Sequence, residues 1–305
     1  MMPSRALAMA GAALAALALA GCTPSAVDIR PHVVVTTNIL GDVVAEIAGD
    51  QAEVIKLMKP NADPHSFEIS AQQAAAMEHA DLLVANGLGL EEGLQQHVDR
   101  ARSAGVAMVV AGEVIEVLDY ASGETAGVPD PHFWTDPARV VDVVEAVEAA
   151  LIEVDGVDAA AVGANADAYL AELGELDHEM VSAFAAIPAA QRALVTNHHV
   201  FGYLADRFDF EIVGTVIPGG TTLAAPSAAD LRDLANAIET AGAPTIFAES
   251  SQPDRLVQVL AREVGLDVDV VELFTESLTD PGEGADTYLA MMRENTARIS
   301  DGLTR

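Results

Sequence analysis

The sequence predicts an α/β protein with two lobes, each a parallel sheet flanked by helices, and with the ligand site in the cleft between the lobes. The first observation is that short apolar runs alternate with segments of helical periodicity, which is typical of parallel sheets covered by helices. The second is that this alternation occurs twice, over residues 32–110 and 193–300, with only helical pattern between Pro137 and Ile187. We therefore expect two halves joined by a long helix, and the space between them is the natural binding site.

The first half is predicted to contain four strands and three helices. His32–Thr37 is an apolar run that indicates a buried strand, and the segment after it has helical spacing and stops at Gly49. Ser70 is a good N-cap for the second helix. In chain order we predict strand 32–37, helix 39–48, strand 52–58, helix 70–79, strand 81–86, helix 93–103 and strand 107–110.

The middle of the chain is predicted to be helical, and the second half to alternate again. Asp136 is a good cap and Pro137 suits a first helical turn. After a break at Asp155-Gly156, apolar residues recur at steps of three and four until Pro188, namely Tyr169, Leu173, Leu176, Met180 and Phe184. We then predict strand 193–196, helix 200–208, strand 211–217, helix 227–241, strand 245–248, helix 253–264, strand 268–273 and helix 287–300.

The N-terminus has the anatomy of an export signal that ends in a lipidation site. Ala6 to Ala20 is an unbroken apolar run of about 15 residues, which suits a signal peptide and is shorter than the roughly 20 residues of a membrane-spanning helix. It is followed by Gly21 and Cys22, the only cysteine of the chain, and Leu19-Ala20-Gly21-Cys22 resembles a bacterial lipobox. A chance cysteine in an ordinary signal peptide is the alternative. We expect a lipid on Cys22 to anchor the protein at the extracytoplasmic face of the cell membrane.

These patterns divide the chain into five predicted parts. They are a signal peptide at residues 1–21, a lipidated tether at 22–31, an N-terminal α/β lobe at 32–150, a connecting helix region at 151–188 and a C-terminal α/β lobe at 189–305. Because the mature chain has no second cysteine, it can form no internal disulfide, and packing must stabilise both lobes.

The charge of the chain is strongly negative. Without Arg5, which lies in the signal peptide, 14 basic residues face 47 acidic ones, a formal charge of −33. Such a surface repels nucleic acid and concentrates cations. The acids are spread along the whole chain, however, so a solvated surface explains them as well, and the charge alone does not indicate a cation site.

Four segments with metal-binding side chains follow or adjoin predicted strands. They are residues 61–68, 130–137, 197–199 and 272–277. Ligands bind at the carboxyl ends of strands in open α/β sheets, and three imidazoles with a carboxylate suit Zn²⁺ or Mn²⁺. The acids Asp63, Asp130 and Asp136 lie close enough in sequence to accept the second N–H of a ligand histidine.

The same segments resemble the successive motifs of one family, the zinc- and manganese-binding lipoproteins of bacterial ABC importers (cluster A-I, or cluster 9, solute-binding proteins). The resemblance runs from about Val33 to the C-terminus. The motifs are Asp63-Pro64-His65-Ser66-Phe67-Glu68, Asp130-Pro131-His132-Phe133-Trp134-Thr135-Asp136-Pro137, His198-x-x-Phe201-Gly202-Tyr203 and Leu273-Phe274-Thr275-Glu276-Ser277. Asn86-Gly87-Leu88-Gly89-Leu90-Glu91 and Phe247-Ala248-Glu249 are lesser similarities. The family implies that the middle helix is a rigid connector.

The resemblance also implies the ligands. His65 and His132 become the ligands of the first half, and His198 the third, because the family places a ligand three residues before the motif phenylalanine. His199 then occupies a variable position, and we hold it with Asp63 and Asp136 as a candidate for the surroundings of the ligands. The fourth ligand departs from the family, which usually has Asp where this chain has Glu276; Asp280 and Glu272 are weaker candidates.

The ligand set predicts zinc first and manganese second. Three imidazoles and one carboxylate make a tetrahedral zinc set, and zinc lies above manganese in affinity. Family members dedicated to manganese often have Glu at the position of His198, whereas many zinc importers carry a long histidine-rich loop. The corresponding stretch here, 119–130, is short and has no histidine, which removes one supporting sign for zinc.

The predicted function is capture of a divalent metal and its delivery to the membrane subunits of an ABC permease, by a protein that is a monomer and not an enzyme. One alternative is a secreted metal-dependent hydrolase with His65, His132 and His198 as ligands and Glu276 as general base. The other is an adhesin or structural surface lipoprotein whose metal is incidental.

Overall fold

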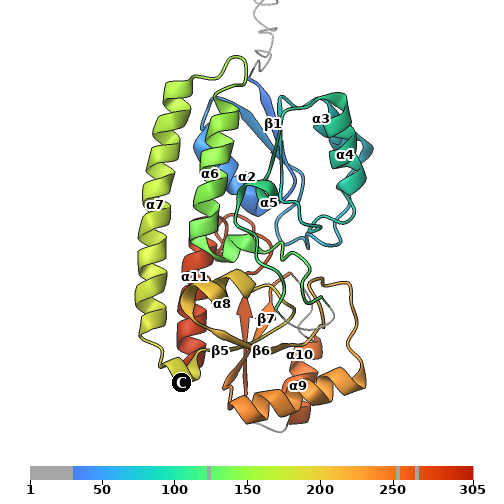
Figure 1. Ribbon diagram of the computed structural model, residues 1–305, viewed down its shortest axis with the longest axis vertical. Coiled ribbons are helices and arrows are strands. Elements are labelled where there is room, and N and C mark those ends of the chain that lie inside the picture. The colour runs from blue at the N-terminus through green and yellow to red at the C-terminus, as the bar shows by residue number, and fades with distance from the viewer. Residues whose placement is uncertain (1–29, 122–124, 252–254, 265–267, 305) are drawn as a thin grey trace, which may run out of the picture. The chain divides into compact units, whose positions relative to one another are not determined.

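The computed structural model describes residues 30–121, 125–251, 255–264 and 268–304. The predicted signal peptide, Cys22 and most of the predicted tether lie outside these ranges. Residues 31–305 form one compact unit, and Figure 1 labels many of its helices and strands. None of the helices within the described ranges is both long enough and apolar enough to cross a membrane.

The first sheet has four parallel strands in the order β2-β1-β3-β4. Its strands and helices are β1 (His32–Val35), α2 (Asn38–Ala48), β2 (Glu53–Lys56), α3 (Ala71–Glu78), β3 (Leu82–Ala85), α4 (Gln95–Ala104), β4 (Met108–Val110) and α5 (Ala111–Val114). Successive side chains of β1 point to opposite faces. Val34 shares an apolar cluster with residues of α3 and α4, whereas Val33 and Val35 share another with residues of α2. The sheet is therefore covered on both faces.

The second sheet repeats this plan with the order β6-β5-β7-β8. Its elements are β5 (Ala193–Thr196), α8 (Gly202–Phe208), β6 (Glu211–Thr215), α9 (Ala228–Ala241), β7 (Thr245–Glu249), α10 (Arg255–Val264), β8 (Asp269–Leu273) and α11 (Tyr288–Leu303). One face packs on α9 and α10 through Val195 and Ile246. On the other face, Leu194 and Phe247 belong to a different apolar cluster. The prediction of two lobes with parallel sheets is confirmed.

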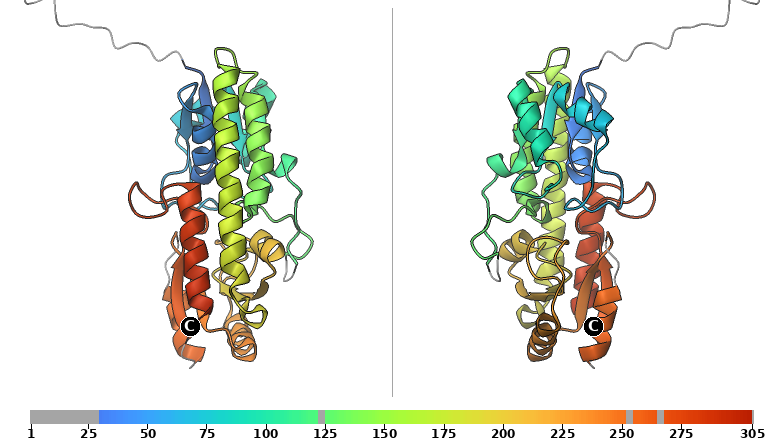
Figure 2. Two further views of the ribbon diagram at one scale, coloured as in Figure 1. Left: turned by 90° about the vertical axis from the view of Figure 1, so that its left-hand side faces the viewer. Right: turned by 90° about the vertical axis from the view of Figure 1, so that its right-hand side faces the viewer.

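Two helices lie between the sheets in sequence, α6 (Pro137–Leu151) and α7 (Ala159–Ala185). As predicted, Pro137 opens α6 and Asp136 caps it, accepting a 2.9 Å hydrogen bond from the N–H of Ala138. Figure 2 shows α7 running beside both α6 and α11, and α7 packs against α2, α6 and α11. The five apolar residues predicted for its inner face, from Tyr169 to Phe184, are all buried.

The apolar core is continuous between the lobes. Side chains of β1, α7 and β8, such as Val33, Leu173 and Leu273, belong to the same buried cluster. Because interiors are close-packed and transmit strain, this shared core opposes large hinge motion of one lobe against the other.

Several predicted boundaries differ from the structure by a few residues. Strand 32–37 ends at Val35, because Thr37 leaves the strand and caps α2 through a 3.3 Å hydrogen bond from the N–H of Leu40. Helix 200–208 begins only at Gly202, and strand 211–217 ends at Thr215. The single turn α5 was not predicted, since four residues are too few to show a periodicity. Short 3₁₀ turns, η1 (Phe133–Thr135) and η2 (Ala189–Gln191), flank the helical region.

Candidate metal centre

Four side chains that are far apart in sequence meet between the two sheets. His65 lies on the loop after β2, and His132 lies just before η1, in the loop that leads to α6. His198 follows β5 directly, and Glu276 follows β8. All four side chains are almost completely buried, with at most 3% of each residue exposed. The structure thus brings together the three predicted histidines and the predicted glutamate.

Their donor atoms converge on one point. Glu276 Oε1 lies 2.9 Å from Nε2 of His65, 3.1 Å from Nε2 of His132 and 3.1 Å from Nε2 of His198. The donor atoms all lie within 4.8 Å of one another, and this is the one such group among the described residues. Nε2 of His65 and Nε2 of His132 are 3.4 Å apart. Three ring nitrogens and a carboxylate oxygen around a common centre are the arrangement that a cation requires.

Two of the histidines each lie on a turn with the sequence Asp-Pro-His. Asp63 Oδ1 accepts a 2.9 Å hydrogen bond from the N–H of His65, and Asp130 Oδ1 accepts one of the same length from the N–H of His132. The proline between them has a fixed φ and no N–H of its own. Each turn therefore presents its histidine with little freedom.

Contacts with the first lobe hold the loop that carries Glu276. The indole N–H of Trp134 donates to the carbonyl of Thr275 at 2.8 Å. Asn38 donates to Ser277 Oγ at 2.8 Å and accepts from the N–H of Leu278 at 3.0 Å. Hydrogen bonds to the first lobe thus fasten the loop on both sides of Glu276.

The three imidazoles differ in what lies behind them. His132 Nδ1 is 2.7 Å from Asp130 Oδ1. His198 Nδ1 is 3.1 Å from Glu249 Oε2, an ion-pair distance whose alignment falls short of a regular hydrogen bond. His65 Nδ1 has no hydrogen-bond partner although it is buried.

The predicted surroundings of the ligands are only partly those observed. Asp63 holds the backbone of His65 and also accepts a 2.6 Å hydrogen bond from Thr222 Oγ1 of the second lobe. Asp136 caps α6 and lies near Arg139 and Arg207, away from the imidazoles. Sequence reasoning assigned Glu249 no role, although its position at the end of a strand beside β5 was a usable signal.

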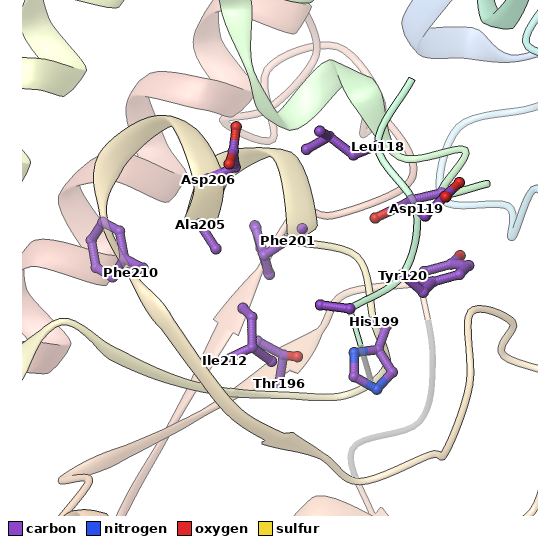
Figure 3. Close-up of a pocket in the computed structure, with 13 residues that line it drawn as sticks. Leu118, Asp119, Tyr120, Thr196, His199, Phe201, Ala205, Asp206, Phe210 and Ile212 are labelled. Carbon is purple, nitrogen blue, oxygen red and sulfur yellow. The ribbon is translucent and has the colours of Figure 1, made fainter. Parts of the chain in front are cut away.

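The other weighed residues lie apart from the cluster. Glu272 and Asp280 are exposed, and Glu272 pairs with Arg298. His199 is half-buried and lines a neighbouring cavity of about 460 Å³ (Figure 3). Its ring centroid is 6.1 Å from that of Tyr120, whose hydroxyl lies 3.4 Å from His132 Nδ1.

The protonation of the cluster follows from burial opposed by charge. Burial favours the neutral form of His132 and His198, but Asp130 acts on the first, Glu249 on the second and Glu276 on both, so the pKa of His132 is raised and that of His198 is raised well above 6.5. Burial would raise the pKa of Glu276, yet the three histidines hold it well below its ordinary value. Burial and the charge of Glu276 raise the pKa of Glu249. These directions favour the charged forms of His132, His198 and Glu276 and the neutral form of Glu249.

Three imidazoles and a carboxylate, assembled from two parallel sheets that share a long helix, define the class of two-lobed proteins with a metal site between the lobes. The chain belongs to the family described as "Zinc-uptake complex component A periplasmic" (ZnuA), whose sequence profile matches residues 33–302. The resemblance to metal-binding lipoproteins of ABC importers is thereby confirmed.

Individual relatives cover nearly the whole chain. The manganese-binding lipoprotein MntA of Halalkalibacterium halodurans is 30% identical over 295 residues, which are 95% of this chain and 96% of MntA. The zinc-binding protein TroA of Treponema pallidum is 32% identical over 289 residues, 93% of this chain and 92% of TroA. A solved structure of the periplasmic TroA has a TM-score of 0.83 at 31% identity and covers 90% of this chain and 100% of that chain.

Proposed function

We propose that the protein is an extracytoplasmic solute-binding lipoprotein that captures a divalent transition metal, Zn²⁺ first and Mn²⁺ second, and delivers it to an ABC-type permease. The observation that carries the proposal is the convergence of four buried donor atoms from both lobes on one point. Membership of a family of zinc-uptake components supports it, as do relatives named for binding zinc and manganese.

The proposed ligands are His65, His132, His198 and Glu276. The metal would take the place at which the imidazoles now meet Glu276 Oε1, and each histidine would bind through Nε2. Glu276 Oε2 is buried and has no hydrogen-bond partner, so the carboxylate has a second oxygen available to the ion. Metal binding would compete with protonation of His132 and His198, whose pKa values are raised, because a ligand histidine must be neutral.

A transport role is favoured over hydrolysis by the closed ligand set. Catalytic zinc keeps an open position for water, whereas four protein ligands close the coordination sphere. In a hydrolase Glu276 would stand back as a general base; here its Oε1 is within 3.1 Å of all three Nε2 atoms. The family is one of uptake-complex components.

Zinc is favoured over manganese by the three nitrogen donors, since imidazole suits zinc and an oxygen-rich site suits manganese. The relatives support both metals, because MntA is named for manganese and TroA for zinc.

Delivery implies partners at the membrane. Relatives named as lipoproteins support a lipid on Cys22 and a place on the extracytoplasmic face. The cargo would then pass from a monomer to the permease subunits, without contact to nucleic acid. If the protein were an adhesin with incidental metal, removal of the ligands would leave cellular metal uptake unchanged, whereas for a carrier it would reduce uptake.

The test is isothermal titration of metal-stripped protein that starts after Cys22, with Zn²⁺ and with Mn²⁺, beside His198→Ala and Glu276→Ala. One zinc bound tightly by the parent, and much more weakly by both variants, is the expected result. If Glu276→Ala binds as tightly as the parent, the site is a three-histidine one with an open position, and the hydrolase reading replaces the carrier.

A further inference from the structure

The groups near Nδ1 of a ligand histidine can influence how its Nε2 binds the metal. We infer that Glu249 is a positioning residue that holds His198 as a nitrogen donor and thereby sets the preference for zinc over manganese. The inference rests on the proposed function, since it concerns the same site.

Glu249 is built into the second lobe and not into the local turn of its histidine. It is the last residue of β7, which pairs with β5 next to the start of the His198 loop, and only 2% of it is exposed. Asn197 Nδ2 donates to its Oε2 at 3.1 Å, and Ser251 Oγ donates to its Oε1 at 2.6 Å. These two hydrogen bonds fix the carboxylate, and Oε2 is left 3.1 Å from His198 Nδ1.

The charge of Glu249 has little other reason to be buried. Burying a carboxylate costs free energy unless it is paired and hydrogen-bonded, and among the described residues its ion-pair partner is His198. A carboxylate behind a ligand imidazole fixes the tautomer and the ring orientation and makes the ligand more basic. A proton on His198 Nδ1 would face Glu249 Oε2 at 3.1 Å, and this tautomer leaves the lone pair of Nε2 for the common centre next to Glu276 Oε1.

The three ligand histidines provide an internal comparison. Asp130 plays the corresponding part for His132 but lies only two residues away on the same turn, so its place follows from local structure. His65 Nδ1 has no such partner. Glu249 is therefore the carboxylate that acts on one ligand imidazole from a neighbouring strand, through its side-chain contacts with His198 and Asn197.

The consequence for the metal is selective. Zinc gains most from well-oriented imidazole, whereas manganese is bound mainly by oxygen donors. Loosening His198 should weaken zinc more than manganese, because Glu276 still supplies its oxygens.

The experiment compares Glu249→Gln with Glu91→Gln. Glu91 is a matched control: it is a buried glutamate of the first lobe, 6% exposed, that accepts hydrogen bonds from Thr36 Oγ1 and the N–H of Asn86 and touches none of the four ligands. Titrations with Zn²⁺ alone and with Mn²⁺ alone, each against a competing chelator, give the two affinities. The visible spectrum of the Co²⁺-loaded protein reports the geometry of the site.

For Glu249→Gln we expect zinc affinity to fall roughly 10- to 100-fold, manganese affinity to fall less, and the Co²⁺ bands to shift. Glu91→Gln should leave the zinc-to-manganese ratio and the bands unchanged. If Glu249→Gln binds zinc like the parent, or loses both metals equally, the inference is overturned. If Glu249→Gln does not fold, Glu249→Asp, which keeps the charge but withdraws it by one methylene, should lower the same ratio, and an unchanged ratio overturns the inference too. A parent protein that binds neither metal would instead overturn the proposed function.

Discussion

The two lobes have the same strand order but use the same place in the sheet differently. β1 and β5 are each the first strand of their lobe and each lies second in the sheet. The residues after β1 include Asn38, which fastens the loop of Glu276, whereas the residues after β5 include His198, which offers a donor atom to the centre. The topology places the residues after β1 and after β5 at equivalent positions, at the carboxyl ends of the strands. The side chain at each position decides whether it offers a donor atom to the centre or supports a loop that does.

The lobes also differ in how they present their histidines. Both histidines of the first lobe stand on Asp-Pro-His turns, whereas His198 follows a strand directly and depends on Glu249 of a neighbouring strand. The first lobe thus encodes its donors locally, and the second lobe encodes its histidine through the sheet.

The largest expected effect is that of the metal itself, because its ligands come from both lobes. Zinc at about 1,000 times its Kd should stabilise the folded protein by about 4 kcal/mol. Thermal unfolding of stripped and zinc-loaded protein, followed by calorimetry, measures this, and a chelator should reverse it. Equal melting temperatures would contradict a site shared by the lobes.

Next is the loss of the donor in the second lobe. His198→Ala should lower zinc affinity by more than the roughly 100-fold that marks the upper range for outer-shell partners, because it removes Nε2 and leaves Glu249 and Glu276 buried beside each other. Titration with zinc against a chromophoric chelator checks this. An affinity within a factor of about ten of the parent would show that His198 is not a ligand.

Asn38, at the equivalent position of the first lobe, should affect the free energy of unfolding more than the affinity for zinc. Asn38→Ala removes the hydrogen bonds to Ser277 and Leu278 and should cost about 1–3 kcal/mol of unfolding free energy, since buried polar groups lose their partners. Urea unfolding of the stripped protein measures the cost. If zinc affinity falls as far as in His198→Ala, the division between binding and supporting positions is wrong.

A smaller effect is expected from pH, which should change the stability of the stripped protein and the affinity for zinc in opposite directions. The raised pKa values of His132 and His198 give the stripped protein stability that is fully present below the ordinary pKa of 6.5 and is lost as pH rises through the folded values. The lowered pKa of Glu276 gives stability that is fully present above the ordinary pKa of 4.5 and is lost as pH falls from there through the folded value. Zinc binding instead improves as the imidazoles lose protons. The gap between the melting temperatures of loaded and stripped protein should therefore widen from about pH 6 to about pH 8, and a constant gap would contradict it.

The smallest effect is expected at the neighbour of His198. His199→Ala should change zinc affinity by less than about twofold, because its ring lines the adjoining cavity and not the cluster. The same titration as for His198→Ala measures it, and a loss as large as that of His198→Ala would mean that the two histidines exchange places.

Features with short-range causes could be read from the chain. The caps at Ser70 and Asp136, the proline at the start of α6 and the inner face of α7 follow from neighbours within a few residues, and each was predicted. His65 and His132 were marked by Asp-Pro-His motifs. The choice of His198 over His199 depended on resemblance to a family, because two adjacent histidines look alike in periodicity and composition.

Local patterns of hydrophobicity and turn chemistry act over one or two helical turns, and they suffice for two parallel sheets, a long joining helix and the segments that bear the histidines. Which carboxylate lies behind His198 depends on the pairing of β5 with β7. The place of the Glu276 loop depends on the hydrogen bond between Asn38 and Ser277, which are 239 residues apart in sequence. A hydrogen bond of 3 Å requires positions that only the packed sheets define. Asp130, two residues from His132, could therefore be named from the sequence, whereas Glu249, the partner of His198, emerged only from the folded chain.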